Sequence, residues 1–185
     1  MPDDLRAHLV ATGVELVTGE GTEALTLREI ARRAGVSHGA PRRYFPTHRE
    51  LLAAVARVGF ERLTARVTAL EANEDPRAEL LALGRLYLDF ARTDRGMFEL
   101  MFRHELLRGN QEGLRGVSKP LFAVLVRLVG RARPGTEDAA VVAGALWANL
   151  HGIAQLWSWG SLQMTVDTDN VDALLRAAID AYVER

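Results

Sequence analysis

The sequence predicts an all-α protein. Its apolar residues recur at spacings of three and four along nearly the whole chain, which is the period of an amphipathic helix. Alternating strand patterns and the Asn-Gly and Asp-Gly pairs of tight hairpins are missing from the sequence. With 185 residues, 48% hydrophobic and 25% charged, the chain can bury a core and has the composition of a soluble globular protein. We therefore expect about nine helices, arranged as a small N-terminal head and a larger helical body.

Three helices are expected in the N-terminal head. The first follows Asp3 or Asp4 and ends near residues 19–21, where glycines interrupt the apolar pattern. The second begins after Thr26, which has the spacing of a capping box with Glu29: each side chain can bind the other's backbone N–H. The third helix is short.

A tight turn separates the second helix from the third. Gly35 can adopt the left-handed conformation that ends a helix, and Ser37 can cap the next one. The third helix is expected at about residues 38–45, where Pro46 stops it. A second capping-box pattern at residues 47–50 then opens a long helix. This helix and the later ones are predicted at about residues 47–72, 77–92, 95–107, 112–133, 138–159 and 170–184.

Composition excludes several kinds of chemistry. The sequence contains no cysteine, so disulfides, thiolate metal sites and cysteine nucleophiles are excluded. The five histidines form no known metal-binding or catalytic motif, and there is neither a phosphate-binding loop nor a nucleophile elbow. We therefore expect no catalytic residues, no metal site, no cofactor and no enzyme activity.

The N-terminus and the hydropathy pattern predict a location. The first residues are acidic and do not resemble a signal peptide. No stretch is expected to approach the roughly 20 apolar residues that span a bilayer. We therefore expect a cytoplasmic protein with no membrane contact.

Charge is distributed unevenly, although the whole chain carries only −1. Residues 27–50 contain six arginines and two glutamates, a net +4, whereas residues 134–185 contain two arginines and seven acidic residues, a net −5. A basic patch on two short helices joined by a glycine turn is typical of a helix-turn-helix that binds DNA phosphates. The alternative is a small helical bundle with solvated arginines.

The sequence of the head decides in favour of DNA binding. The run TLREIARRAGVS at residues 26–37, followed by GAPRRYFP at 39–46 and ELL at 50–52, resembles the DNA-binding domain of TetR-type transcriptional regulators over about residues 5–60. Pro41 and Arg42 stand where many members have Leu-Tyr, and His48 stands where many have lysine. The resemblance implies a bacterial, dimeric repressor that a small apolar or aromatic effector releases from its operator. A helical ligand-binding or interaction module that does not bind DNA is the alternative.

The residues expected to contact DNA lie on the second helix, the third helix and the start of the fourth. They are Thr26, Arg28, Ser37, His38, Ala40, Arg42, Arg43, Tyr44 and His48. Arg43 is the strongest single candidate. For Arg32 and Arg33, solvated charge and phosphate contact both remain open.

The remaining two-thirds of the chain is expected to mediate dimerisation. We expect a DNA-binding domain at residues 1–48 and an effector-binding and dimerisation domain at 49–185, with the helix from about residue 48 shared. One recognition helix reads too few base pairs, so a homodimer on palindromic double-stranded DNA is expected. The resemblance implies that the last two helices of each subunit form a four-helix bundle. Its candidate residues are Ala140, Gly144, Ala148, Gly152, Leu174, Leu175, Ala178 and Tyr182. An intramolecular core is the alternative for each.

Aromatic and methionine residues provide candidates for an effector site. Trp147 and His151 share a helix face, and with Gly152 they resemble the Trp-x-x-x-His-Gly motif of one C-terminal subfamily of TetR-type regulators. The candidate effector contacts are Tyr87, Phe90, Met97, Met101, Phe102, Phe122, Trp147, His151 and Gln155. Plain core packing is the alternative interpretation of the same residues.

Overall fold

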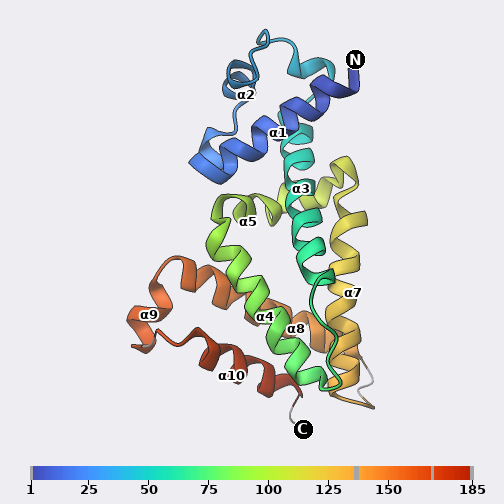
Figure 1. Cartoon of the computed structure of the whole chain (residues 1–185), viewed down its shortest axis with the longest axis vertical. Coiled ribbons are helices and arrows are strands. Elements are labelled where there is room, and N and C mark those ends of the chain that lie inside the picture. Colours follow the sequence, from blue (N-terminus) through green and yellow to red (C-terminus); the bar gives the residue numbers. More distant parts are fainter. Residues whose placement is uncertain (1, 136–137, 168, 184–185) are drawn as a thin grey trace. The chain divides into compact units, whose positions relative to one another are not determined.

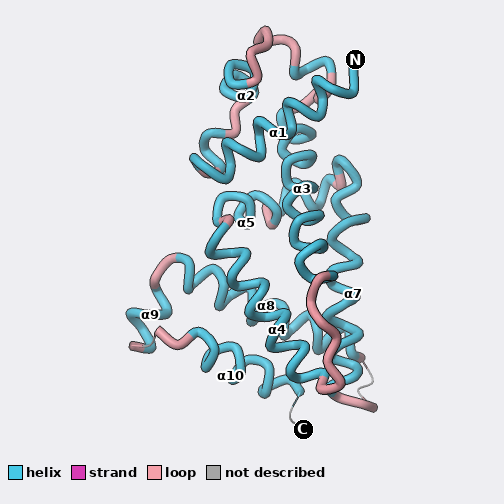
Figure 2. Tube along the Cα trace, viewed as in Figure 1, coloured by secondary structure: helices cyan, strands magenta, loops and turns pink. Residues whose placement is uncertain are grey.

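The all-α prediction is confirmed by a computed structural model of the chain, which describes residues 2–135, 138–167 and 169–183. Within these ranges there are ten α-helices, three short 3-10 helices (labelled η) and no strand. Figures 1 and 2 show helices joined by mostly short loops. The count of about nine helices was therefore slightly low.

The chain divides into two compact units. Unit 1 comprises Met1–Arg62 and Asp94–Ser118, and unit 2 comprises Leu63–Thr93 and Lys119–Arg185. Unit 1 contains α1 (Pro2–Glu20), η1 (Thr22–Ala24), α2 (Leu27–Arg33), η2 (Pro41–Arg43), most of α3 (His48–Thr68), α5 (Arg95–Met101), α6 (His104–Gly109), η3 (Gln111–Gly113) and the start of α7 (Leu114–Ala132). Unit 2 contains the rest of α3 and α7, together with α4 (Pro76–Thr93), α8 (Ala139–Ser158), α9 (Ser161–Val166) and α10 (Val171–Val183).

Two regions of helix differ from the prediction. The single helix expected at residues 95–107 is two helices, because Arg103 adopts an extended backbone (φ −62°, ψ 119°) between α5 and α6. The short helix α9 was not predicted at all. It follows Gly160, whose left-handed conformation (φ 77°) lets the chain turn after α8.

The core of unit 1 forms where α1 packs against α2, η1 and α5. The face of α1 that the sequence predicted is buried, with Leu9, Leu16 and Val17 almost completely shielded from solvent. At Gly96 the backbone of α5 comes so close to α1 that a Cβ atom would lie 2.2 Å from the Val17 carbonyl oxygen. Only glycine permits this approach.

In unit 2 the helices α4, α8 and α10 pack against one another. Two ion pairs join α4 to α10: the Arg77 Nε donates to the Asp180 Oδ1 (2.7 Å), and the Arg85 guanidinium binds both carboxylate oxygens of Asp172 (2.6 and 2.8 Å). These pairs lie beside the buried apolar faces of the helices and fix α10 in register against α4.

One expectation about hydropathy was wrong. By length and composition alone, α8 is apolar enough to cross a membrane. The core helix of a folded domain passes the same test, and α8 buries Ala143, Leu146, Leu150 and Ala154 while it packs against α4 and α10.

The close approach at Gly96 gives a test of the packing. We predict that Gly96→Ala lowers the free energy of unfolding by about 2 kcal/mol or more, because the added methyl group meets backbone that cannot yield. Gly116→Ala is the matched control: it lies in α7 with open space around the added atom and should be neutral or stabilising by up to about 1 kcal/mol. Urea denaturation measures both, and equal losses of stability would contradict the packing.

Candidate functional site

The helix α2 begins as predicted, but its capping box is only half formed. The Glu29 amide donates to the Thr26 Oγ1 at 3.1 Å. The reciprocal bond was predicted wrongly, because the Thr26 amide donates to the Ala24 carbonyl of η1 (2.8 Å) and the Glu29 carboxylate accepts from Arg32 and Arg33 instead. Thr26 thus caps the helix, while Glu29 is used by the arginines one turn further along.

A tight turn ends α2 and sets the direction of the next segment. Gly35 is left-handed (φ 67°), the Val36 amide donates to the Ala31 carbonyl (3.0 Å) and the Gly35 amide donates to the Arg32 carbonyl (3.3 Å). These two bonds are those of a Schellman motif, which satisfies the free carbonyls at a helix end. The turn predicted at Gly35 is confirmed.

The third helix of the head is not the predicted α-helix over residues 38–45. Here only η2 is helical, and the turn closes through bonds from the Ala40 amide to the Ser37 carbonyl (2.9 Å) and from the Phe45 amide to the Pro41 carbonyl (2.8 Å). Pro41 has no N–H to extend an α-helix from Ser37, and Ser37 contributes its backbone carbonyl rather than the predicted side-chain cap. We call residues 37–45 the recognition segment.

The recognition segment has an inward and an outward side. Pro41 and Phe45 are buried, whereas His38, Arg42 and Arg43 are exposed. Of the other predicted contact residues, Ser37 is exposed and Ala40 and Tyr44 are half-buried. The two buried residues anchor a short turn that displays its cationic side chains to solvent.

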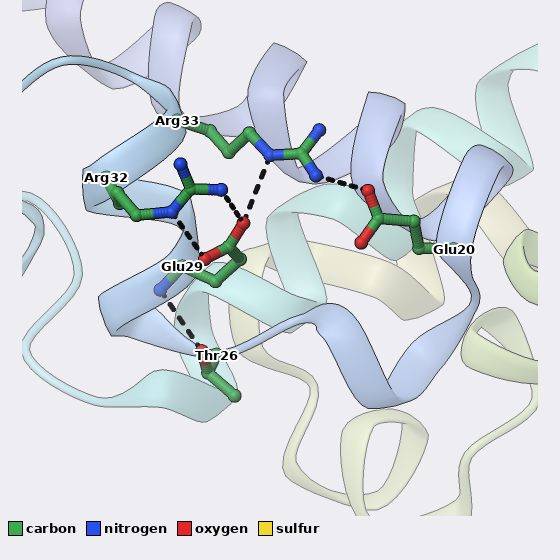
Figure 3. Close-up of polar contacts among 5 residues, drawn as sticks. All are labelled: Glu20, Thr26, Glu29, Arg32 and Arg33. Atoms are coloured by element: carbon green, nitrogen blue, oxygen red, sulfur yellow. Dashed lines mark hydrogen bonds and ion pairs between the residues drawn. The ribbon is translucent and has the colours of Figure 1, made fainter.

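The arginines at the end of α2 are neutralised by neighbouring acids, as Figure 3 shows. Glu29 accepts from the Arg32 Nε (2.8 Å) and from the Arg33 Nε (3.0 Å), and Arg33 also pairs with Glu20 of α1. Hydrogen bonds from Arg32 above all, and from Arg33, lower the pKa of Glu29 to about 2. The question left open for Arg32 and Arg33 is thus answered in part: both are exposed, but their charges are paired within the chain.

Four other arginines of the head keep their full charge. Arg28 on α2, Arg42 and Arg43 in the recognition segment, and Arg49 at the start of α3 are exposed, and none forms an ion pair with any residue that the structure describes. Arg49 was counted in the basic patch but was not among the predicted contacts. An exposed, uncompensated guanidinium group is suited to binding phosphate or a guanine edge.

His48 has a structural contact that its sequence position did not reveal. Its Nε2 donates to the Leu25 carbonyl, and this bond ties the start of α3 to the loop before α2. The predicted second capping box is complete: the Thr47 amide donates to Glu50 Oε2 (3.2 Å) and the Glu50 amide to Thr47 Oγ1 (3.3 Å).

In unit 2, an aromatic cluster brings together several predicted effector contacts from α4, α7 and α8. The Trp147 Nε1 donates to the Tyr87 hydroxyl oxygen (3.3 Å), and the Tyr87 hydroxyl donates to the His151 Nδ1 (2.7 Å). The Phe122 ring meets the Trp147 ring edge to face, with centroids 6.4 Å apart. We call Tyr87, Phe122, Trp147 and His151 the aromatic cluster.

The aromatic cluster is uncharged at neutral pH. Burial raises the pKa of Tyr87 and lowers the pKa of His151, so both side chains remain neutral at pH 7. A neutral His151 can accept the Tyr87 proton in a hydrogen bond, as the geometry requires. Trp147 and Phe122 remain partly open to solvent, at 39% and 36%.

Two family models match the sequence. Residues 9–55 match the model of bacterial regulatory proteins of the tetR family, and residues 80–182 match the tetracyclin repressor-like C-terminal domain. The second match alone covers more than half of the chain. The chain belongs to the TetR family. It is accordingly a DNA-binding transcriptional regulator with a helix-turn-helix domain and a helical C-terminal domain.

Solved structures have the same fold. A protein of unknown function from Rhodococcus sp. RHA1 is 34% identical, with a TM-score of 0.79 over 97% of this chain and 94% of that chain. BioQ with its natural double-stranded DNA operator is 19% identical, with a TM-score of 0.73 over 97% and 98% of the two chains. The multidrug binding protein EbrR complexed with ethidium is 24% identical, with a TM-score of 0.67 over 96% and 98%. The last two likenesses show the fold alone. No curated protein matches the sequence.

The remaining predicted effector contacts of this TetR-family chain lie apart from the aromatic cluster. Met97, Met101 and Phe102 belong to unit 1, where both methionines are fully buried and a Cβ atom at Gly59 would lie 2.6 Å from the Met101 sulfur. In unit 2, Phe90 is buried beneath the Arg66 guanidinium group, 5.9 Å from the ring centroid, and Gln155 is half-buried. The methionines thus pack tightly against the backbone of α3.

The candidate dimer residues fall into two groups. Leu175 and Ala178 are buried inside unit 2, where Leu175 packs against Gly84 of α4, so they have almost no surface to offer a partner. The other candidates keep accessible surface: Ala140 and Ala148 are exposed, and Gly144, Gly152, Leu174 and Tyr182 are half-buried. The sequence pattern alone did not separate the inward from the outward face of α10.

Proposed function

We propose that this regulator is a dimeric repressor that binds a palindromic double-stranded operator through its recognition segment. A small apolar or aromatic effector would bind the helical body and release the DNA. The observation that carries the DNA-binding role is the set of four exposed, unpaired arginines on three consecutive elements around the turn at Gly35. We place the protein in the bacterial cytoplasm, where its DNA is.

The charges of the head support a division of labour at the operator. Arg42 and Arg43 lie on the segment whose counterpart in a helix-turn-helix enters the major groove, so we assign them base edges or adjacent phosphates. Arg28 and Arg49 flank that segment and suit phosphates. The other predicted contacts, namely Thr26, Ser37, His38, Ala40, Tyr44 and His48, are proposed to position the DNA backbone or border the groove. For His48 only the Nδ1 side of the ring is proposed for this role, since Nε2 binds Leu25.

The exposed face of α8 supports dimerisation. This 20-residue helix has no Asp, Glu, Lys or Arg, and its outward residues Val141, Ala145, Ala148, Gly152 and Leu156 recur at spacings of four and three. Val141 and Leu156 are 65% and 39% exposed. An apolar helix face of this length with small residues at its centre permits close approach of a second copy. A two-fold dimer then matches a palindromic operator.

The aromatic cluster supports an effector role for unit 2. Its partly exposed Trp147 and Phe122 rings can stack on a flat aromatic molecule, and the Tyr87 and His151 polar groups can orient one. Since α3 and α7 each run from one unit into the other, we propose that these helices carry the change to the head. We also propose that the Trp147, His151 and Gly152 pattern marks the C-terminal subfamily to which the chain belongs.

Selection of binding sites from a random duplex library tests the DNA-binding role and identifies the operator sequence in the same experiment. The wild-type protein should enrich a palindromic sequence, and a gel shift of that sequence should weaken steeply as salt rises. Failure to enrich any sequence would contradict the proposed function.

The pairing of arginines predicts a contrast between two variants of equal charge. Arg43→Ala should weaken binding to the selected duplex by at least about 1 kcal/mol and flatten the salt dependence, because an uncompensated cation is lost. Arg32→Ala should lose much less affinity, because Glu29 already neutralises this arginine. Fluorescence anisotropy at several salt concentrations measures both, and equal losses would sink the assignment.

The α8 face predicts how a single charge affects assembly. Ala148→Glu should weaken the dimer by about 3 kcal/mol or more, because it buries an unpaired carboxylate in an apolar interface. Ala123→Glu, an exposed alanine on α7, is the matched control and should leave the dimer intact. Sedimentation velocity reports both, and an Ala148→Glu protein that remains dimeric would show that α8 is not the interface.

The aromatic cluster predicts which tryptophan an aromatic ligand needs. Ethidium, used as a probe, should raise the melting temperature of the wild-type protein in a saturable way. Trp147→Leu should abolish this effect, and Trp159→Leu, the same change at an exposed residue after α8, should preserve it. The absence of a wild-type shift, or an unchanged shift in Trp147→Leu, would argue against this site.

A further inference from the structure

The recognition segment ends on a ring that is covered by a cation. Phe45 is fully buried, and its amide closes the turn onto the Pro41 carbonyl (2.8 Å). The guanidinium carbon of Arg6, from α1, lies over the Phe45 ring at 5.0 Å from its centroid. An arginine at this distance is attracted by the face of the ring.

A carboxylate holds that cation in place. Glu112, in η3, forms an ion pair with the Arg6 guanidinium group, and its side chain is only 24% exposed. The Glu112 backbone carbonyl accepts a hydrogen bond from the Arg57 Nη1 of α3 at 2.8 Å. Glu112 therefore connects α1 with α3, and through Arg6 it reaches the end of the recognition segment.

The backbone at Glu112 is unusual for a residue that has a side chain. Its φ of 54° lies in the left-handed region, where glycine is favoured. The neighbouring left-handed residue Asn110 has a local use, because its Oδ1 accepts from the Arg115 amide at the start of α7 (2.8 Å). For Glu112, the use that the structure shows for the side chain is the contact with Arg6.

We propose that Arg6 is a positioning residue for DNA recognition: Glu112 holds its guanidinium group over Phe45, and this contact fixes the end of the recognition segment that carries Arg42 and Arg43. Arg6 acts through Phe45 and does not touch the DNA. The inference rests on the proposed operator binding for its effect on affinity, and on the contacts of unit 1 alone for its effect on the segment.

A direct phosphate contact by Arg6 is the rival explanation, since its side chain is 40% exposed. The two explanations differ in their dependence on salt. A lost phosphate contact lowers the slope of log affinity against log salt by about 0.9 per contact, whereas a lost positioning contact leaves the slope unchanged. They also differ without DNA, because only a positioning residue alters the mobility of the segment in the free protein.

Three variants of the full chain test the proposal. Arg6→Gln removes the cation, and Glu112→Gly removes the carboxylate while relieving the left-handed backbone. Both should weaken binding to the selected duplex about tenfold with an unchanged salt slope and an unchanged melting temperature. Arg6→Lys keeps the cation over the ring and should stay within about threefold of the wild type.

A second readout needs no DNA. In hydrogen-exchange mass spectrometry of the free protein, Arg6→Gln should speed exchange in the peptide containing Tyr44 and Phe45 and leave α10 unchanged. A flattened salt slope, unchanged affinity, or unchanged exchange would each overturn the proposal. Failure of the operator-binding role would appear separately, as a wild-type protein that selects no DNA, and the exchange experiment would still decide the role of Arg6.

Discussion

The hydrogen bond from the Val36 amide to the Ala31 carbonyl closes the turn on which the whole DNA-binding surface depends. It requires the left-handed Gly35, and it ends α2 after only seven residues. Because the chain turns here, the next residues leave α2 and return through Pro41 and Phe45 into the core of unit 1. The exposed arginines of the recognition segment follow from that return: the two buried anchors hold the turn, and Arg42 and Arg43 stand between them.

Pairing of charges decides which arginines of the head remain available. Residues 27–50 carry a net charge of +4, but two of their six arginines are engaged by Glu29 and Glu20. The remaining four are exposed and unpaired among the residues described. Two roles are thereby separated on one short surface, since Arg32 and Arg33 pair with acids of α2 and α1 while the others face solvent. Exposed pairs of this kind add little stability individually, so their main effect is on where uncompensated charge lies.

Features set by residues close in the chain were predictable from the sequence. The turn at Gly35, the cap at Thr26 and the box at residues 47–50 depend on side chains within four positions of one another, and all three formed. The family resemblance then indicated the role of the head. The apolar spacing also located the long helices to within a few residues.

Features set by contacts between distant residues were not predictable in this way. The bond from His48 to Leu25 joins positions 23 apart, and the ion pair of Arg6 with Glu112 joins positions 106 apart. The outward face of α10 could not be separated from its inward face, because Leu174 and Leu175 are adjacent and only the packing on α4 shows which one is buried. The 3-10 geometry of the recognition segment likewise follows from Pro41 and the anchoring of its ends, which the helical pattern alone does not contain.

Arginine footprinting tests most directly whether the uncompensated arginines of the head form the DNA-binding surface. The protein is modified with phenylglyoxal alone and with its selected duplex, and each site is quantified by mass spectrometry. We expect DNA to protect Arg28, Arg42, Arg43 and Arg49 and to leave Arg85 and Arg176 of unit 2 unchanged, with much weaker protection at Arg32 and Arg33. Equal protection of the paired and unpaired arginines of the head, or no protection of Arg42 and Arg43, would contradict this role.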